Sequence, residues 1–343
     1  MNNRKRKEIL FDIYSKNFSF IKNHSSLKDN FDKDFGCYCP ICLNYFERAD
    51  LFDKTNPLTI EHNPPQSLGG KGSVLTCKKC NSEAGHKIDN EILTALLEID
   101  ALNFKPNSEI RTKFFNDATD GKGVNAKIKI ENDGTFIINI DKKNNNPETH
   151  DKFIKSEVYE YKSPLFSNDI IETGWNKKLS FTFEKPNKRN ERLASISLLK
   201  IGYLMVFEKL GHLYLFNKNA EIVREQIKFP EKEIIKNPFW IHYKFPDNML
   251  GVNIITKPRD LRSILVVFDL KTKSDTYRIS LCLPGFSEGD DKIYNNISDK
   301  LCREEGFENV EVNNYINSEY NIKDIENTFL LVKFWESFVE KQS

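Results

Sequence analysis

The sequence lacks an excess of charge of either sign. It holds 51 Lys and Arg against 50 Asp and Glu, a formal net charge of +1. Its first hundred residues are balanced as well, with 14 side chains of each sign. A strongly basic chain would indicate a nucleic-acid partner at once. Charge therefore neither favours nor excludes a phosphate-bearing partner, and any basic surface must come from local segregation of charge.

The sequence also lacks a long uninterrupted apolar run. Its most apolar stretch, residues 193–216, is broken by Lys200, Glu208 and Lys209, so we expect no membrane span and no membrane partner. The basic residues 1–7 are not followed by the apolar segment and small-residue cleavage site of a signal peptide. We therefore expect a cytoplasmic protein, in which cysteine pairs are more typical of metal sites than of disulfides.

With 343 residues, of which 39% are hydrophobic and 29% charged, the chain has the composition of a globular protein of about two domains. The patterns predict an α+β protein. Its parts would be a helical lead-in over residues 1–35, a compact metal-binding module over 36–105, and an accessory domain over 106–343. The accessory domain would be a larger α+β domain with a mostly antiparallel sheet, with a role in target recognition or regulation.

Hydrophobic periodicity places the expected elements. Asn132-Asp133-Gly134 lies between two alternating runs, which is a strong hairpin signal over residues 124–141. The longest helical pattern, residues 190–210, is apolar on much of its circumference and predicts a buried central helix. Further helices are expected at 4–23, 87–101, 287–304 and 325–341, and further strands at 178–184, 251–256, 263–270 and 276–283.

Four cysteines form two C-x2-C pairs: Cys39 with Cys42, and Cys77 with Cys80. Each pair turns two thiolates in the same direction, and two such turns complete a tetrahedral site that suits zinc. A closed four-cysteine site leaves no position for water, so this Zn²⁺ would be structural. The remaining cysteines are interpreted as a bystander next to the first pair and two core residues: Cys37, Cys282 and Cys302.

The segment between the two cysteine pairs carries the chemistry. It contains Glu61-His62, Pro64 and Gly69-Gly70, and the second pair is followed directly by Asn81. An acidic-His pair, a Pro two residues on, a Gly-Gly turn and Leu-x-C-x-x-C-Asn resemble the zinc-bearing branch of the HNH endonucleases. The resemblance covers roughly residues 36–92 and implies a ββα-metal fold, with the acidic-His pair on a hairpin and the Asn on the helix that follows.

The resemblance implies a role for each of these residues. Phosphodiester hydrolysis needs a deprotonated water and a group that holds the charge gathering on the leaving oxygen. His62 would be the general base, because a neutral imidazole can take up a proton near neutral pH. Glu61 and Asn81 would hold a catalytic Mg²⁺ or Mn²⁺ at the phosphate, since carboxylate and amide oxygens suit such ions. By family analogy, the products would carry 5′-phosphates.

Two departures from the family pattern affect this interpretation. The acidic residue is Glu61 instead of the commoner Asp, and the middle Asn of the pattern, expected near Gly72 or Ser73, is missing. His86 lies five positions after Asn81, a poor spacing for one helix face, and is either a further ligand of the catalytic metal or a surface histidine. Asp89 is expected to be structural, as a cap of the next helix.

The leading hypothesis is a metal-dependent DNA endonuclease, in the biological setting of restriction or anti-phage defence. The alternatives are a non-catalytic zinc module that binds nucleic acid or protein, and an RNA-directed nuclease of the same chemistry. The missing middle Asn favours the binding module, and the intact Glu61-His62 pair with Asn81 argues against it. A protein partner and a homo-oligomer both stay open. The basic segment 185–192 either contacts phosphates or is a solvated loop.

Overall fold

The computed structural model describes residues 2–24, 32–115, 120–157, 189–236, 240–242, 245–301, 309–318 and 322–323. The chain forms two compact units. Unit 1 comprises residues 1–94, 190–272 and 276–343, and unit 2 comprises residues 95–189 and 273–275. The expected strand 178–184, the expected helix 325–341 and Cys302 lie outside the described residues. No helix in the described ranges is long and apolar enough to cross a membrane.

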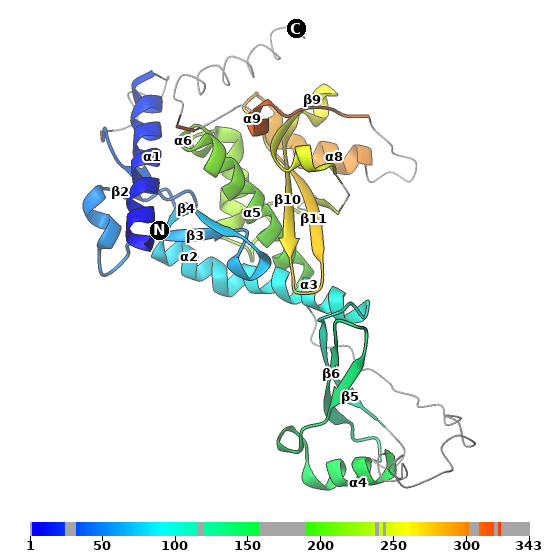
Figure 1. Cartoon of the computed structure of the whole chain (residues 1–343). Coiled ribbons are helices and arrows are strands. Elements are labelled where there is room, and N and C mark those ends of the chain that lie inside the picture. The colour runs from blue at the N-terminus through cyan, green and yellow to red at the C-terminus, as the bar shows by residue number, and fades with distance from the viewer. Residues whose placement is uncertain are drawn as a thin grey trace. The chain divides into compact units, whose positions relative to one another are not determined.

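Unit 1 is built around helix α5 (Glu191–Leu210), which is buried on nearly all sides. The helix begins where the Asn190 side chain accepts a hydrogen bond from the Leu193 backbone N–H, a standard N-cap. It contacts a β-hairpin near the N-terminus of the chain and a five-stranded sheet from the C-terminal part (Figure 1). The predicted buried central helix is confirmed, and its uniform apolarity follows from having packing partners on more than one side.

The five-stranded sheet is antiparallel throughout, as predicted, with the strand order β12-β9-β10-β11-β8. At Gly202 of α5 the helix approaches it so closely that an added Cβ would lie 2.7 Å from Leu281. The strands are β8 (Trp240–His242), β9 (Gly251–Lys257), β10 (Ser263–Lys271), β11 (Thr276–Leu283) and β12 (Glu311–Asn313).

The expected ββα order is present in the metal module. Strands β3 (Leu58–Asn63) and β4 (Lys71–Cys77) pair antiparallel, and helix α2 (Lys78–Ala84) follows β4 directly. A π-helical turn, Gly85–Asp89, joins α2 to α3 (Asn90–Leu102). A short pair of strands, β1 (Cys37–Tyr38) and β2 (Tyr45–Phe46), precedes them.

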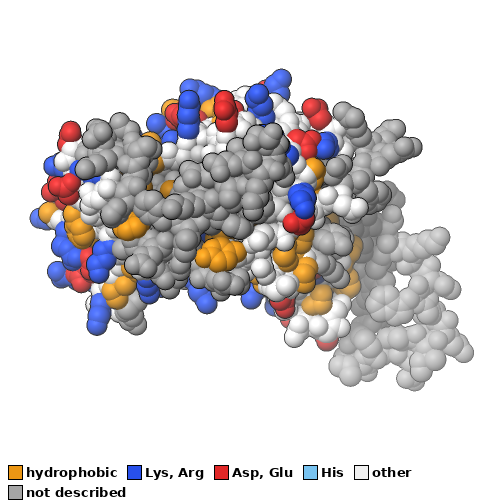
Figure 2. All heavy atoms as spheres, turned by 90° about the horizontal axis from the view of Figure 1, so that it is seen from above, with side chains coloured by type: hydrophobic (Ala, Val, Ile, Leu, Met, Phe, Trp, Pro, Cys, Tyr) orange, Lys and Arg blue, Asp and Glu red, His pale blue; other side chains and the backbone are white. Residues whose placement is uncertain are grey.

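The predicted N-terminal helix is α1 (Asn3–His24), which contacts β4 and α6. Its Tyr14 ring stacks on Phe207 of α5, with 4.9 Å between ring centroids. The remaining helices that the structure describes in unit 1 are short: α6 (His212–Leu215), α7 (Glu221–Lys228), α8 (Ile293–Leu301) and α9 (Tyr315–Ser318). On the face drawn in Figure 2, acidic and basic side chains lie side by side over the described residues, in keeping with the balanced composition.

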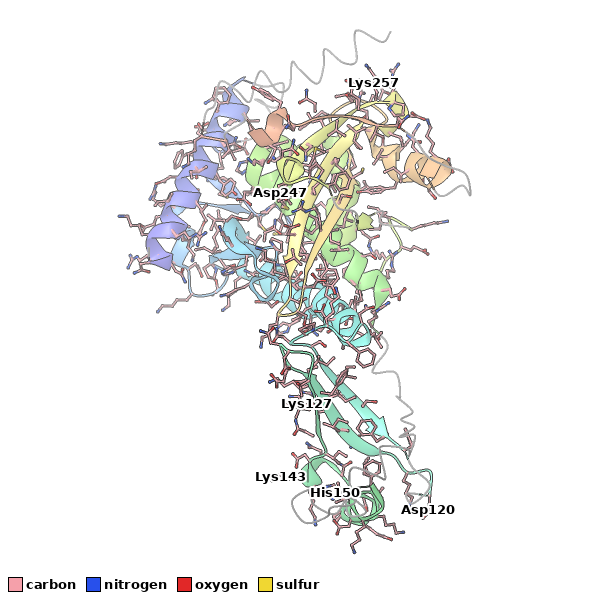
Figure 3. The ribbon with its side chains drawn as sticks, turned by 45° about the vertical axis from the view of Figure 1, so that its right-hand side comes forward. Asp120, Lys127, Lys143, His150, Asp247 and Lys257 are labelled. Atoms are coloured by element: carbon pink, nitrogen blue, oxygen red, sulfur yellow. The ribbon has the colours of Figure 1, made fainter. Side chains whose placement is uncertain are left out.

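Unit 2 contains the predicted hairpin. Strands β6 (Val124–Ile130) and β7 (Phe136–Asn139) pair antiparallel, and β5 (Glu109–Phe114) pairs with β6 on its other side. Helix α4 (Pro147–Glu157) adds Phe153 to a core that includes Phe114 and Ile128. Figure 3 shows Lys127 on this sheet and His150 on α4. The division of the chain at residues 35 and 105 into parts with separate roles stays a prediction.

Candidate active site and metal centre

The four cysteines of the two C-x2-C pairs converge in one cluster. The Sγ atoms of Cys39, Cys42, Cys77 and Cys80 all lie within 4.8 Å of one another, and the Cys42 and Cys77 sulfurs are 3.8 Å apart. A tetrahedral zinc ion with Zn–S bonds of about 2.3 Å separates its sulfurs by roughly 3.8 Å. The predicted four-cysteine site is therefore present, and its donor set fits Zn²⁺.

Local backbone geometry prepares these sulfurs for a cation. The Cys77 backbone N–H donates to Cys39 Sγ, and the Cys80 backbone N–H donates to Cys77 Sγ, each at 3.4 Å. Hydrogen bonds from the Cys39 thiol and its neighbours hold the pKa of the Cys77 thiol well below its usual range. Cys37 and Cys282 are buried and lie outside the cluster, as predicted. Four thiolates leave no open coordination position on a tetrahedral ion, which is typical of structural zinc sites.

Strand β3 carries the acidic-His pair beside an irregularity in the hairpin. Glu61 lies opposite Val74 and His62 lies opposite Gly72, so Ser73 on β4 is an extra residue, a β-bulge. Glu61 is 3% exposed, whereas His62 is half-buried. Within the described residues, the His62 ring has no hydrogen-bond partner and is half-buried on β3.

The bulge explains why the middle Asn of the family pattern is missing at one of its two expected positions. A Cβ added to Gly72 would lie 2.5 Å from Ile60 Cγ2 and 3.5 Å from His62 Nε2. No side chain fits at position 72 unless the Ile60 side chain moves. At the other position, Ser73 donates a hydrogen bond of 2.7 Å from Oγ to Glu208 Oε2 on α5. Ser73 thus links β4 to α5 at this position.

Close backbone approach also explains the Gly-Gly turn of the motif. Gly69 has a φ of 86°, in the left-handed region that favours glycine. A Cβ on Gly70 would lie only 1.5 Å from the Pro64 carbonyl oxygen. The turn therefore requires glycine at position 70 and favours it at position 69, and it returns the chain from β3 to β4 beside the acidic-His pair.

Glu61 is engaged by a buried ion pair. Lys200 Nζ of α5 lies 2.7 Å from Glu61 Oε1 and 2.7 Å from Asp89 Oδ2. Thr76 Oγ1 lies 3.4 Å from the second carboxylate oxygen, Oε2. Burial raises the pKa of Glu61, and the attraction of the Lys200 ammonium opposes this shift. The pKa of Lys200 is raised, because the two carboxylates outweigh the effect of its burial.

Asn81 lies on the same side of the hairpin as Glu61. Its amide nitrogen donates 3.1 Å to Thr59 Oγ1, and the Thr59 hydroxyl donates to the backbone oxygen of Thr76. Thr76 in turn contacts Glu61. The structure therefore connects the two expected metal ligands through a pair of threonines, and it leaves Asn81 Oδ1 without a partner among the described residues.

Three residues near His62 contact α5 in ways that the sequence analysis did not predict. Asn63, directly after His62, is buried and donates from Nδ2 to the Ile201 carbonyl oxygen at 3.0 Å. Lys200 binds Glu61, directly before His62. The Asp89 carboxylate faces Ser197 and Lys200 of α5, so the expectation that it caps the next helix was wrong. A lysine in the middle of an apolar helix was the one available signal, because such a residue needs a buried partner.

Two other candidate groups lie away from this cluster. His86, in the π-helical turn, is exposed, and the structure does not bring it into contact with Glu61. Of the basic segment 185–192, residues 189–192 are described. The Arg192 guanidinium donates to Gln226 Oε1 and to the backbone oxygens of Lys232, Ile235 and Lys236. Arg192 therefore braces the loop that follows α7 and is not free to contact phosphate.

The oxygen donors of Glu61 and Asn81 are of the type that Mg²⁺ and Mn²⁺ prefer. In the described arrangement, however, an ammonium group lies at hydrogen-bond distance from the Glu61 carboxylate. A divalent ion at the same oxygen would meet this positive charge at close range. The residues therefore have the right chemistry for a divalent ion but do not fit one while the Lys200–Glu61 pair is formed.

Comparison with known proteins identifies one part of the chain. Residues 39–97 match the family model of the HNH endonucleases. The matched segment includes all four clustered cysteines, the Glu61-His62 pair and Asn81. No curated protein and no solved structure matches the chain.

Proposed function

Residues 39–97 belong to the HNH endonuclease family, and on this premise we propose that the chain is an endonuclease that hydrolyses phosphodiester bonds of DNA. The observation that carries the proposal is the free, half-buried His62 on the ββα hairpin, next to Glu61 and beside a closed four-cysteine cluster. Its biological setting, by association with HNH proteins that carry an appended domain, is restriction or anti-phage defence.

In this proposal His62 is the general base. Its imidazole takes a proton from water, the hydroxide attacks phosphorus, and the bond from phosphorus to the 3′ oxygen breaks. The leaving oxygen takes up a proton from solvent, and the product carries a 5′-phosphate. Glu61 and Asn81 would hold a Mg²⁺ or Mn²⁺ ion, which supplies charge stabilisation at the phosphate when it is bound. The four cysteines would hold a structural Zn²⁺, and His86 is a further candidate at the catalytic ion.

The anchoring of β3 supports this assignment. The residues on both sides of His62 are tied to consecutive residues of α5: Glu61 to Lys200 and Asn63 to Ile201. A general base must be held in position relative to the phosphate, because a small displacement lowers the rate steeply. We infer that α5 serves as the support of the catalytic strand.

The deciding experiment is the cleavage of plasmid DNA in the presence of Mg²⁺ or Mn²⁺, with wild type beside His62→Ala and with zinc content measured on both. We expect metal-dependent cutting by wild type and a loss of about 10²- to 10⁴-fold in rate in the zinc-loaded variant. The matched control is His150→Ala, on α4 of unit 2, which should cut like wild type. Equal activity of wild type and His62→Ala would refute the assignment of the base.

A second candidate function has one observation in its favour. The Glu61 carboxylate is buried and already paired with Lys200, which suits a zinc module that binds nucleic acid or protein without cutting. Binding of DNA by wild type and His62→Ala alike, with no cleavage by either, would favour this module. An RNA substrate of the same sequence, assayed in parallel, separates a DNA-directed from an RNA-directed nuclease, because the site chemistry addresses the phosphodiester in both.

A further inference from the structure

A buried cluster of three charged side chains joins the nuclease hairpin to α5. The side chains of Lys200, Glu61 and Asp89 are 2%, 4% and 13% exposed. Two carboxylates against one ammonium leave one formal negative charge in excess. Among the described residues, no second basic side chain forms an ion pair with either carboxylate. The cluster is therefore arranged around one cation, the Lys200 ammonium, and its excess negative charge would attract a second cation.

The position of the ammonium is the significant feature. It occupies one oxygen of Glu61, on the hairpin face where Thr59 and Thr76 connect Glu61 to Asn81. This is the face that presents the oxygen donors suited to a divalent ion. Two cations cannot share one carboxylate oxygen at close range without strong repulsion in a buried site. Lys200 and a divalent ion therefore exclude each other at Glu61.

Asp89 gives the ammonium an alternative partner. Lys200 Nζ is 2.7 Å from Asp89 Oδ2 as well as from Glu61, so it keeps an ion pair when it gives up Glu61. Ser197 holds the other oxygen of Asp89 at 3.2 Å and fixes that carboxylate against α5. Releasing Glu61 therefore does not leave Lys200 as an unpaired buried charge, which would be far more costly.

We propose that Lys200 is a built-in competitor of the divalent cation, which binds Glu61 only after displacing the ammonium toward Asp89. This inference rests on the proposed function, because it takes Glu61 as a metal ligand of the nuclease site. It adds to the family pattern a residue of α5 that sets how much metal the enzyme needs. The apparent metal affinity is lowered by the fraction of molecules in which the Lys200–Glu61 pair is intact.

The test is a titration of the zinc-loaded full chain with Mn²⁺, in which free Mn²⁺ is followed by electron paramagnetic resonance. Wild type is compared with Lys200→Met, which keeps an unbranched side chain, one heavy atom shorter, and removes the charge. We expect Lys200→Met to bind Mn²⁺ at least about tenfold more tightly, as follows if the pair is intact in nine molecules of ten. Mn²⁺ should also raise the melting temperature of the variant more than that of wild type.

Lys200→Met leaves two buried carboxylates without a counter-charge, which destabilises the metal-free fold. Lys200→Gln is therefore measured in parallel, since its amide still donates hydrogen bonds. The matched control is Lys22→Met, which removes another buried lysine that pairs with Asp34 outside the site and should leave Mn²⁺ affinity unchanged.

Wild-type or weaker Mn²⁺ affinity in both Lys200 variants, including no binding at all, would overturn the competition. The result is independent of DNA cleavage. Tighter Mn²⁺ binding without cleavage by any form of the protein would support the role of Lys200 and remove the proposed nuclease function. Cleavage that depends on His62, with unchanged Mn²⁺ affinity in the Lys200 variants, would support the proposed nuclease function and overturn the role of Lys200.

Discussion

His212 shows how strongly surroundings determine the behaviour of a single residue. It is completely buried among aromatic rings, including Tyr14, Phe18 and Tyr38. The Tyr38 backbone N–H donates to its Nε2 at 3.2 Å, so this nitrogen must be unprotonated, and Nδ1 lies 3.3 Å from Asn17 Oδ1. Burial lowers the pKa of His212 from 6.5 to about 3. This histidine is a neutral packing residue, whereas His62 is half-buried and has no hydrogen-bond partner among the described residues.

The lowered pKa predicts a loss of stability in acid. A proton binds the unfolded chain more readily than the folded one, so the contribution of His212 is complete above about pH 6.5 and is lost as the pH falls toward about 3. Between pH 7 and pH 5, this residue should lower the free energy of unfolding by roughly 2 kcal/mol. Chemical denaturation of His212→Gln at pH 7 and pH 5 should show a fall in the free energy of unfolding that is smaller than the fall in wild type by this amount. An identical fall in both proteins would contradict the prediction.

Residues alone predicted only part of the site. The types of Glu61, His62 and Asn81 and their spacing from the cysteines were sufficient to identify the motif, because the chemistry needs those groups in that order. The partners of Glu61 and Asn63 were not predictable, since Lys200 and Ile201 lie well over a hundred positions away along the chain. A contact of that separation depends on tertiary packing and leaves no local pattern.

Among the elements, the two turns that carry the C-x2-C pairs depend most on one component, the metal ion that their four sulfurs would bind. Cys80 lies in the first turn of α2, and its N–H donates to Cys77 Sγ. Pro40, in the turn between Cys39 and Cys42, accepts a 2.7 Å hydrogen bond at its backbone oxygen from the Tyr203 hydroxyl of α5. The cysteine cluster thus joins β4, α2 and the Cys39–Cys42 turn. A metal ion bound by all four sulfurs would stabilise the start of α2, the helix that carries Asn81.

Cys80→Ser should therefore lose its zinc and loosen the module. A missing thiolate opens a tetrahedral site, and the free energy of binding a structural zinc is also folding free energy. We expect about one zinc ion per chain in wild type and little in the variant, together with rapid proteolysis within residues 36–105, measured by elemental analysis and mass spectrometry. Cys37→Ser, which changes a buried cysteine outside the cluster, is the control and should keep its zinc. Full zinc in Cys80→Ser would contradict the four-cysteine assignment.

At the scale of the whole molecule, the β3–β4 hairpin does not stand apart from the C-terminal part of the chain. Unit 1 combines residues 1–94 with segments from 190 onward. Ala84, the last residue of α2, and Ile88, in the π-helical turn that follows, form a buried cluster with Ile196 of α5. The predicted module therefore shares its core with a helix that lies about a hundred residues downstream in the sequence.

This arrangement predicts that residues 36–105 do not fold alone. The isolated fragment, supplied with zinc, would expose the faces that α5 covers and leave Glu61 and Asn63 without partners. We expect poor dispersion in its amide NMR spectrum. A chain in which residues 103–189 are replaced by a Gly-Ser linker of about eight residues, which spans roughly 16 Å, should keep its zinc and a well-dispersed spectrum. A well-folded 36–105 fragment would instead support the division predicted from the sequence.

The sequence by itself determined the local features of this protein. Periodicity and turn residues were sufficient for the helices near residues 4–23 and 190–210, the hairpin at Asp133-Gly134 and the antiparallel strands of the C-terminal sheet. Helix 287–304 was predicted too long, since α8 begins at Ile293 after a short 3-10 turn. These features depend on near neighbours, which is why patterns reveal them.

Only the tertiary structure decided what surrounds the acidic-His pair. The burial of Glu61, the Lys200 ammonium against it and the anchoring of Asn63 all arise where α5 packs on the hairpin. The same holds for the assembly of unit 1 from separate stretches of chain. Packing between distant segments is determined by their shape and by the need to pair buried charges, and local sequence patterns predict neither of these.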